Sequence, residues 1–466
     1  MTIAPPAPTS LFGDPGRGDD APSADGPVDW PHIAAELADD LATDAVEREQ
    51  AGQTPYDEVT RLRESGLLTL LVPARRGGGG AGWRTAYTVV RTVAAADGSV
   101  GQLLGSHYFL SYCARFFGGP DRAARIERAS AAGEWCWGGG IASHEPPLML
   151  TPTANGYLLD GHQRCGSGVG VADRLLVRAA VPGAGEPLAV LVDPAHPGLV
   201  SSPGGDTFGR RLTGAGSVAC DSVPVGHDDV LGSLSSDVGA LTPLAGLAVP
   251  TARLVSAQFC LGIAEGLLGE VREQGRAVPD GWDVYARDQY AQDTYAQDDT
   301  YTQDSYAQDP YARDPHVRDP YVRDPYVRDP YVRDAYVRDS YARDPYVLTA
   351  YGELTVAARA ASALADQAVD ALTGGLARGE DLDDEECAEI TVLASAAEAA
   401  AARAAQEITT RALDAVGASA AHTRHGLDRF WRDTRAHTLR EPVAHRLREV
   451  GDYFLNGAHP PFSLPA

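Results

Sequence analysis

The chain has 466 residues with 39 basic and 64 acidic side chains, which gives a formal net charge of −25. Such an acidic chain offers no basic face to neutralise phosphates, which argues against nucleic-acid binding. Apolar residues make up 44% of the sequence, enough for a large core in roughly two to four domains or one large multi-part fold.

The cysteine pattern and the hydropathy pattern bear on the compartment. The six cysteines form no Cys-x-x-Cys pair, so the sequence offers neither a zinc ribbon nor a redox dithiol, and we expect no metal site. No secretory leader is visible, and no uninterrupted apolar stretch approaches the roughly 20 residues that cross a membrane. We therefore expect a cytoplasmic protein with reduced thiols and no contact with a membrane.

The first part of the chain is predicted to be a tail followed by helices. Residues 1–27 are rich in Pro, Gly, Asp, Ser and Ala, and cannot bury enough apolar surface to offset the entropy of ordering, so we predict a disordered tail. From Trp30 onward apolar residues recur at helical spacing, as at Ile33, Leu37 and Leu41. Residues 28–133 are therefore predicted to form an N-terminal α domain.

The pattern changes near Glu134. From there to residue 232 the apolar runs are short, as in the run from Ala189 to Val192, and turn signals such as Asn155-Gly156 separate them. Short apolar runs between frequent turns are typical of strands in a sandwich or barrel. We therefore predict a central β domain over residues 134–232.

Helical periodicity returns after the β domain and is interrupted once. Residues 233–284 and 346–466 are predicted to form a C-terminal α-helical domain, which makes the whole an α+β protein. Between them, residues 285–345 repeat a five-residue unit such as Tyr321 to Pro325. A period of five matches neither helix nor strand, so we predict an inserted low-complexity loop at the surface. An interaction tract that uses Tyr and Arg contacts is the alternative.

Several strings resemble the acyl-CoA dehydrogenase superfamily, whose fold has the same α, β, α order. The finer resemblance is to its flavin-dependent monooxygenase branch, which includes dibenzothiophene monooxygenases and sulfur-acquisition oxidoreductases. The string Gly156 to Gly161 resembles the flavin-facing β segment of the superfamily fold. The strings that carry the finer resemblance are Ser106 to Phe109, Trp135 to Gly138, Cys165 to Gly168, Phe430 to Asp433, Arg435 to Leu439 and Gly451 to Gly457.

The resemblance implies a fold, an activity and partners. The fold has an N-terminal helical domain, a central β-barrel or sandwich domain and a C-terminal helical bundle. The activity is that of an oxidoreductase that receives reduced FMN from a separate flavin reductase. Through a flavin hydroperoxide it oxygenates a sulfur or nitrogen centre of a small apolar substrate. Members of this family often assemble as homotetramers.

The same strings supply the candidate site residues. His437 has an ordinary pKa near neutrality and suits a proton shuttle, and Ser167, between two glycines, can present its hydroxyl to a flavin ring. His107 is a further catalytic candidate, although it lies in an apolar helix where a structural histidine is the alternative. Arg432 and Arg435 both suit a flavin phosphate or an ion pair. The candidate cofactor-binding residues are Trp137, Ser143, Ser167, Gly168, Arg435 and Thr438.

Two other functions fit parts of this sequence. The branch often carries a second histidine three residues after the position of His437, followed by Asp-Pro, whereas Arg440-Glu441-Pro442 follows here. Glu441 has the spacing from Asp433 at which acyl-CoA dehydrogenases place their catalytic glutamate. An FAD-dependent acyl-CoA dehydrogenase with Glu441 as the base is therefore one alternative. A non-catalytic scaffold whose repeat binds partners is the other.

Overall fold

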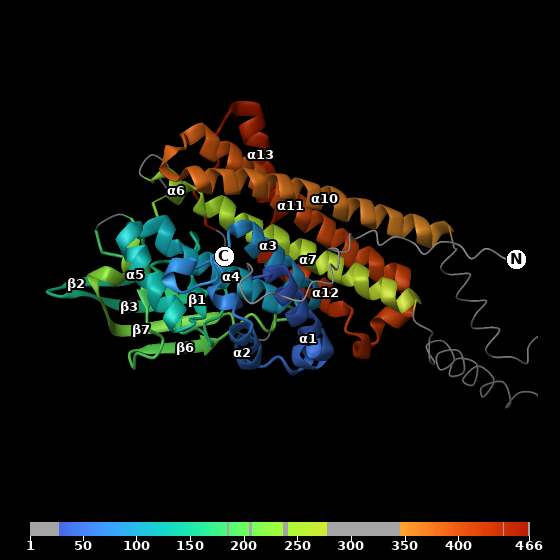
Figure 1. The fold of residues 1–466 in the computed structure, drawn as a ribbon, viewed down its shortest axis with the longest axis horizontal. Helices are drawn as coiled ribbons and strands as arrows, with labels where there is room; N and C mark the ends of the chain where they lie inside the picture. Colours follow the sequence, from blue (N-terminus) through green and yellow to red (C-terminus); the bar gives the residue numbers. More distant parts are fainter. Residues whose placement is uncertain are drawn as a thin grey trace, which may run out of the picture.

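The computed structural model describes residues 28–183, 186–204, 207–235, 241–276, 345–440 and 442–464. The predicted tail, the repeat up to residue 344 and the candidate base Glu441 lie outside the described residues. Within them, helices come first, strands follow, and helices return, which confirms the α+β class (Figure 1).

Among the N-terminal helices, α3 and α5 pack against one almost fully buried helix, α4, and α1 packs against α3. They are α1 (Trp30–Ala51), α2 (Tyr56–Glu64), α3 (Trp83–Ala96), α4 (Gly98–Phe117) and α5 (Gly119–Ala132), with short 3-10 turns at Leu67–Thr69 and Ala74–Arg76. α4 begins where the Asp97 carboxylate accepts a hydrogen bond from the Val100 amide, a typical N-cap. Because α4 is a core helix, its polar side chains, Gln102 and His107 among them, lie inside the protein.

The central strands form a single eight-stranded sheet in the part of the chain that the structure describes. They are β1 (Trp137–Gly140), β2 (Leu148–Thr153), β3 (Gly156–Cys165), β4 (Arg174–Ala180), β5 (Leu188–Val192), β6 (Leu199–Pro203), β7 (Gly216–Val225) and β8 (Val230–Ser233). Their order is β6-β7-β3-β2-β4-β5-β8, and β1 pairs with β4 in parallel. The predicted β domain is confirmed, but the sheet does not close into a barrel, since β6 and β8 are its two edges.

The sheet divides into two halves that share one core. β2 and β4 pair only at Leu148 and Met149, so this short contact joins β6-β7-β3-β2 to the rest. Leu159 and Val218 from one half and Val177 and Val190 from the other belong to the same buried apolar cluster. This cluster is separate from the helical core, which is continuous from the N-terminal helices to the C-terminal ones.

The C-terminal helices pack closely along their small residues. They are α6 (Pro243–Gly246), α7 (Ala248–Arg276), α10 (Pro345–Arg378), α11 (Asp384–Val416), α12 (Asp428–Arg440) and α13 (Val443–Asn456), with 3-10 turns at Gly379–Asp381, Gly417–Ala421 and Thr423–His425. A capping box between Asp383 and Glu386 starts α11. The buried face of α11 is rich in alanine, which allows close approach to α7 and α10.

α7 is the central helix of the molecule. It packs against α3 and α4 on one side and against α10 and α11 on the other (Figure 1). The segment Pro243–Glu273 is long and apolar enough to cross a membrane, with a mean hydropathy of 1.4, yet its apolar window is 100% buried inside the fold. That burial is what a core helix shows.

Candidate active site

A cavity lies where the N-terminal helices, the sheet and the C-terminal helices meet. α4, α7 and α12 contribute side chains to it, and β1 and the turn after β3 contribute mostly backbone. It is lined by Gln102, Ser106, Phe109, Leu110, Gly139, Gly140, Ile141, Gly166, Ser167, Ala252, Val255, Ser256, Phe259 and His437. The lining is mainly apolar with a few polar groups, as is usual for a small-molecule site.

One wall of the cavity is glycine backbone. The Gly139 amide donates to the Ser167 carbonyl at 2.9 Å, and the Gly166 amide donates to the Gly139 carbonyl at 3.2 Å. Gly139 has a φ of +111°, and a Cβ there would lie 2.3 Å from the Leu176 carbonyl oxygen. Only glycine fits this position, because a side chain there would collide with the backbone of β4.

Ser167, a candidate from the sequence, lines the cavity, and its hydroxyl is hydrogen-bonded to backbone. The Ser167 side chain is buried, and its Oγ donates to the Thr213 carbonyl at 3.1 Å. The next amide, that of Gly168, donates to the same carbonyl at 2.8 Å. Gly168 shapes this turn with a φ of +69° and does not itself line the cavity.

His437 faces the cavity from α12. Its ring is buried, 4.9 Å from the ring of Phe259 on α7. Burial lowers the pKa of His437 to about 3, and the positive charges of Arg210 and Arg440 act in the same direction. The imidazole is therefore neutral at physiological pH, and it offers the cavity one N–H donor and one ring-nitrogen acceptor.

The structure corrects the prediction that His107 is catalytic. Its Nε2 lies 2.8 Å from the Leu68 carbonyl, and its Nδ1 accepts a hydrogen bond from the Trp137 amide at 3.0 Å. Burial lowers the pKa of His107 to about 4, so the ring is neutral with both nitrogens bound to backbone. His107 does not line the cavity. It joins α4 to the turn after α2 and to the start of β1.

Two predicted cofactor-binding residues, Trp137 and Ser143, also lie elsewhere. The Trp137 indole is buried, and its Nε1 donates to Ser130 Oγ at 2.9 Å, so this side chain packs the core. Ser143 binds the C-terminal tail, because its Oγ accepts from the Leu464 amide at 3.0 Å. Neither residue lines the cavity.

The other predicted residues of α12 point away from the cavity. Thr438 Oγ1 accepts from Gln406 Nε2 at 2.7 Å. Arg435 is exposed on the outer side of the helix. Arg432 forms ion pairs with Glu49 and Asp428, which raise the pKa of its guanidinium, and this bonding argues against a phosphate role for it here.

Sequence reasoning missed three residues around the cavity. Gln102 is buried on α4, and its Oε1 has no hydrogen-bond partner among the described residues, so the cavity holds an acceptor ready for a ligand. Phe259 covers His437. Asp433 lies four residues before His437 on α12, and that spacing on a helix was a signal available from the sequence.

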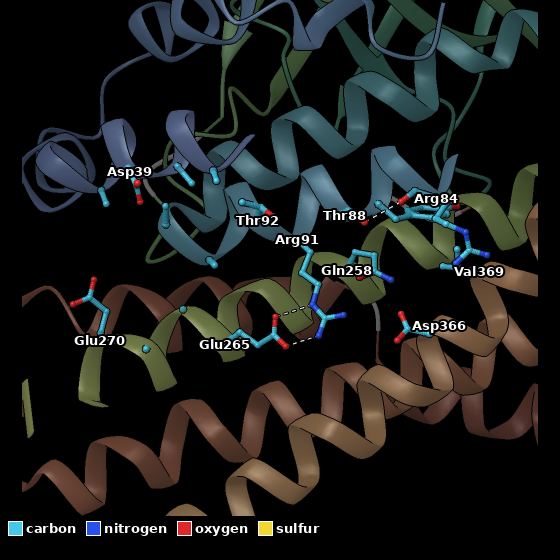
Figure 2. A pocket seen from close by; sticks show the side chains of 18 of the residues that line it. Asp39, Arg84, Thr88, Arg91, Thr92, Gln258, Glu265, Glu270, Asp366 and Val369 are labelled. Carbon is cyan, nitrogen blue, oxygen red and sulfur yellow. Dashed lines mark hydrogen bonds and ion pairs between the residues drawn. The ribbon is translucent and has the colours of Figure 1, made fainter. Parts of the chain in front are cut away.

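A second, larger groove lies on the other face of α7. It has a volume of about 990 Å³ between α1, α3, α7 and α10 (Figure 2). Arg91 and Glu265 form a bidentate ion pair across this groove, with Arg91 Nε 2.7 Å from a Glu265 carboxylate oxygen. Gln258 faces this groove while its neighbour Phe259 faces the cavity, so α7 separates the two spaces.

Comparison with known proteins places this architecture in a class. Residues 32–134 match the acyl-CoA dehydrogenase N-terminal domain, and residues 328–442 match the acyl-CoA dehydrogenase C-terminal domain. Butyryl-CoA dehydrogenase from Megasphaera elsdenii has the same fold, with a TM-score of 0.66 at 18% identity. The protein is thus of the acyl-CoA dehydrogenase class by fold.

The more similar relatives are oxygenases. Dibenzothiophene monooxygenase from Rhodococcus erythropolis is 31% identical over 92% of this chain and 93% of its own. The probable FMNH2-dependent monooxygenase SfnC from Pseudomonas putida is 29% identical over 92% of this chain and 95% of its own. The dibenzothiophene monooxygenase TdsC from Paenibacillus sp. A11-2 superposes with a TM-score of 0.76 at 31% identity, covering 94% of this chain and 99% of TdsC.

The chain belongs to the dibenzothiophene monooxygenase family and is a flavin-dependent monooxygenase of the acyl-CoA dehydrogenase fold. This assignment favours the monooxygenase over the acyl-CoA dehydrogenase and scaffold alternatives. Structures of TdsC exist with FMN and with FMN and indole together.

Proposed function

We propose that this protein uses reduced FMN and molecular oxygen to oxygenate a sulfur or nitrogen centre of a small apolar substrate held in the cavity. The observation that carries the proposal is the cavity itself, which is lined by glycine backbone together with Phe259 and His437. Such a space suits a planar ring on one side and a small apolar molecule on the other. The names of the relatives support the sulfur chemistry, and the indole-bound TdsC supports a heteroaromatic substrate.

The residues present fit a flavin. Gly139, Gly140 and Gly166 line the cavity with backbone, and Ser167 adds a hydroxyl to the same lining. Reduced FMN, when bound, supplies the electrons and the oxygen-activating chemistry. The protein's part is to orient the ring, keep water out and position the substrate.

His437 and Gln102 provide the polar chemistry of the cavity. The neutral His437 ring can accept a proton at its free nitrogen and donate one from the other. The buried Oε1 of Gln102 accepts a hydrogen bond from a bound N–H or O–H group. Ala252, Val255 and Phe259 form the apolar wall, which favours an apolar substrate.

The test is oxygen use by the purified chain. With FMN, an added flavin reductase and dibenzothiophene or indole, we expect oxygen consumption with an oxygenated product. Gln102→Leu keeps the approximate size and should weaken substrate or flavin binding, whereas Gln258→Leu on the opposite face of α7 is the matched control. Rapid reduction of bound FAD by an acyl-CoA would overturn the proposal.

We further propose that a separate reductase supplies the reduced flavin in the cytoplasm and that the enzyme is a homotetramer. The FMNH2 dependence in the name of SfnC supports the external supply. Exposed apolar side chains on α10 and α13 support self-association, namely Tyr346, Leu348, Val356, Phe454 and Leu455. Light scattering of the full chain tests the assembly, and replacement of Phe454 and Leu455 by serine should shift it toward smaller species.

A further inference from the structure

The turn of residues 209–213 lies directly against α12. A Cβ on Gly209 would lie 2.2 Å from the Arg432 carbonyl oxygen, so the turn and the helix are in close backbone contact. At the next residue, the backbone amide of Arg210 donates a hydrogen bond to Oδ1 of Asp433. Asp433 therefore ties this turn to the helix that carries His437.

Arg210 holds an unusual backbone conformation. Its φ is +60°, in the left-handed region that non-glycine residues rarely adopt. The conformation is held at both ends. The Arg210 amide binds Asp433, and the Arg210 carbonyl accepts a hydrogen bond from Thr213 Oγ1 at 3.0 Å. Strained residues persist only where such contacts over-determine them, and they concentrate at functional sites.

The other end of the turn supports the glycine wall. The Thr213 carbonyl accepts hydrogen bonds from Ser167 Oγ at 3.1 Å and from the Gly168 amide at 2.8 Å. A continuous series of bonds thus leads from Asp433 through Arg210 and Thr213 to Ser167. It joins the two walls of the cavity, one in the helical domain and the other in the sheet domain.

The charge of the Arg210 side chain also acts on this region. Arg210 is buried, and its positive charge adds to the burial that lowers the pKa of His437 on α12. It also counts among the charges acting on Cys260 of α7.

Asp433 is buried among charged side chains of both signs. It is buried, and its Oδ2 faces Gly98 at the start of α4, where a Cβ would lie only 2.7 Å away. Burial raises the pKa of Asp433 to about 7 against the hydrogen bond from the Arg210 amide. Asp97 and Glu49 raise this pKa further, and the Arg432 charge lowers it.

We propose that Asp433 is a positioning residue of the monooxygenase. By accepting the Arg210 amide, it holds the 209–213 turn so that the Thr213 carbonyl lies where it accepts the hydrogen bonds of Ser167 Oγ and the Gly168 amide. This inference rests on the proposed function for its catalytic consequence. Its structural part concerns the flavin-free protein and stands or fails independently.

Hydrogen exchange of the flavin-free full chain, measured by mass spectrometry, tests the structural part. Asp433→Ala should raise exchange about tenfold in two peptides, one over residues 207–216 and one over residues 165–172, because a buried hydrogen bond is lost. Asp433→Asn should exchange like the wild type, since the amide oxygen of Asn can accept the same bond. Asp428→Ala is the control. It removes from the same helix a carboxylate whose hydrogen bond is to Arg432.

The catalytic part is read from FMN affinity and from the ratio of product formed to oxygen consumed. Asp433→Ala should weaken FMN binding about tenfold and lower that ratio, and Asp433→Asn should restore both. Arg210→Ala keeps the amide bond to Asp433, so exchange over residues 165–172 should stay at the wild-type level.

Three results would overturn the inference. The first is a folded Asp433→Ala variant with wild-type exchange over residues 165–172. The second is an Asn variant as impaired as the Ala variant. The third applies if the Ala variant does not fold. Thr213→Val then replaces it, because it removes the side-chain bond to the Arg210 carbonyl at nearly constant shape. Wild-type exchange of this variant over residues 207–216 and 165–172 would overturn the inference.

Discussion

The rings of His437 and Phe259 lie 4.9 Å apart and are inclined at 56° in the wall of the cavity. Phe259 belongs to the central helix α7, so the residue that removes His437 from water is part of the core. The resulting burial makes His437 a neutral hydrogen-bonding group, although its ordinary pKa suggested a residue that titrates near neutrality.

Replacing His437 by Ala should divert turnover to hydrogen peroxide while the fold and FMN affinity stay mostly intact. A positioned acid–base group contributes about 100- to 10,000-fold to a rate, and the drop in product per oxygen should lie in that range. The measurement is product against peroxide at fixed oxygen consumption. Because the His437 pKa lies near 3, the wild-type ratio should show no inflection from this residue between about pH 5 and pH 9. Unchanged coupling in the Ala variant would show that His437 is structural.

His107 should make the protein less stable in mild acid. Its folded-state pKa of about 4 is below the unfolded value of 6.5, so the unfolded chain binds the proton first as pH falls. The contribution of His107 to the free energy of unfolding is therefore fully present above pH 6.5. It falls by about 3 kcal/mol as the pH decreases toward 4. Urea unfolding at pH 7.5 and pH 5 measures the decline, which should be shallower in His107→Gln. An equally steep decline in that variant would assign the acid sensitivity to other groups.

Gly139→Ala should destabilise the sheet domain by roughly 2 kcal/mol or more. The new methyl group would meet the Leu176 carbonyl, and the φ of +111° is strained for any side chain. Gly374→Ala in α10 is the control, because a Cβ there meets nothing within 4 Å and alanine favours a helix. Thermal unfolding should show a lower Tm for the first variant and an equal or higher Tm for the second. Equal Tm values for the two variants would mean that the position of Gly139 does not require glycine.

Excision of residues 285–345 should preserve folding, assembly and activity. The removed segment lies between α7, which ends at Arg276, and α10, of which only the first residue, Pro345, is lost. Shortening a connection changes the closure free energy only logarithmically, by well under about 2 kcal/mol. Gel filtration and FMN titration of the shortened chain are the measurements. A monomeric product, or one that no longer binds FMN, would make the repeat a working part of the enzyme.

The face of a helix decides which residues of one string can act together. Successive residues turn by about 100°, so Arg435 and His437 point in nearly opposite directions, while Asp433 and His437 share a face. The resemblance placed Arg435, His437 and Thr438 in one site as a string. Of these three residues, only His437 lines the cavity. The same helical spacing selects Asp433, which shares a face with His437.

The sequence by itself determined the α, β, α order, the family and the two residues, Ser167 and His437, that line the cavity. These follow from periodicity, turn residues and local strings, which are properties of neighbouring positions in the chain. Only the tertiary structure decided that His107 binds backbone, that Trp137 packs the core and that the strands form an open sheet. It also decided that Asp433 reaches Ser167 through Arg210 and Thr213, because pairing partners and burial depend on residues distant in sequence.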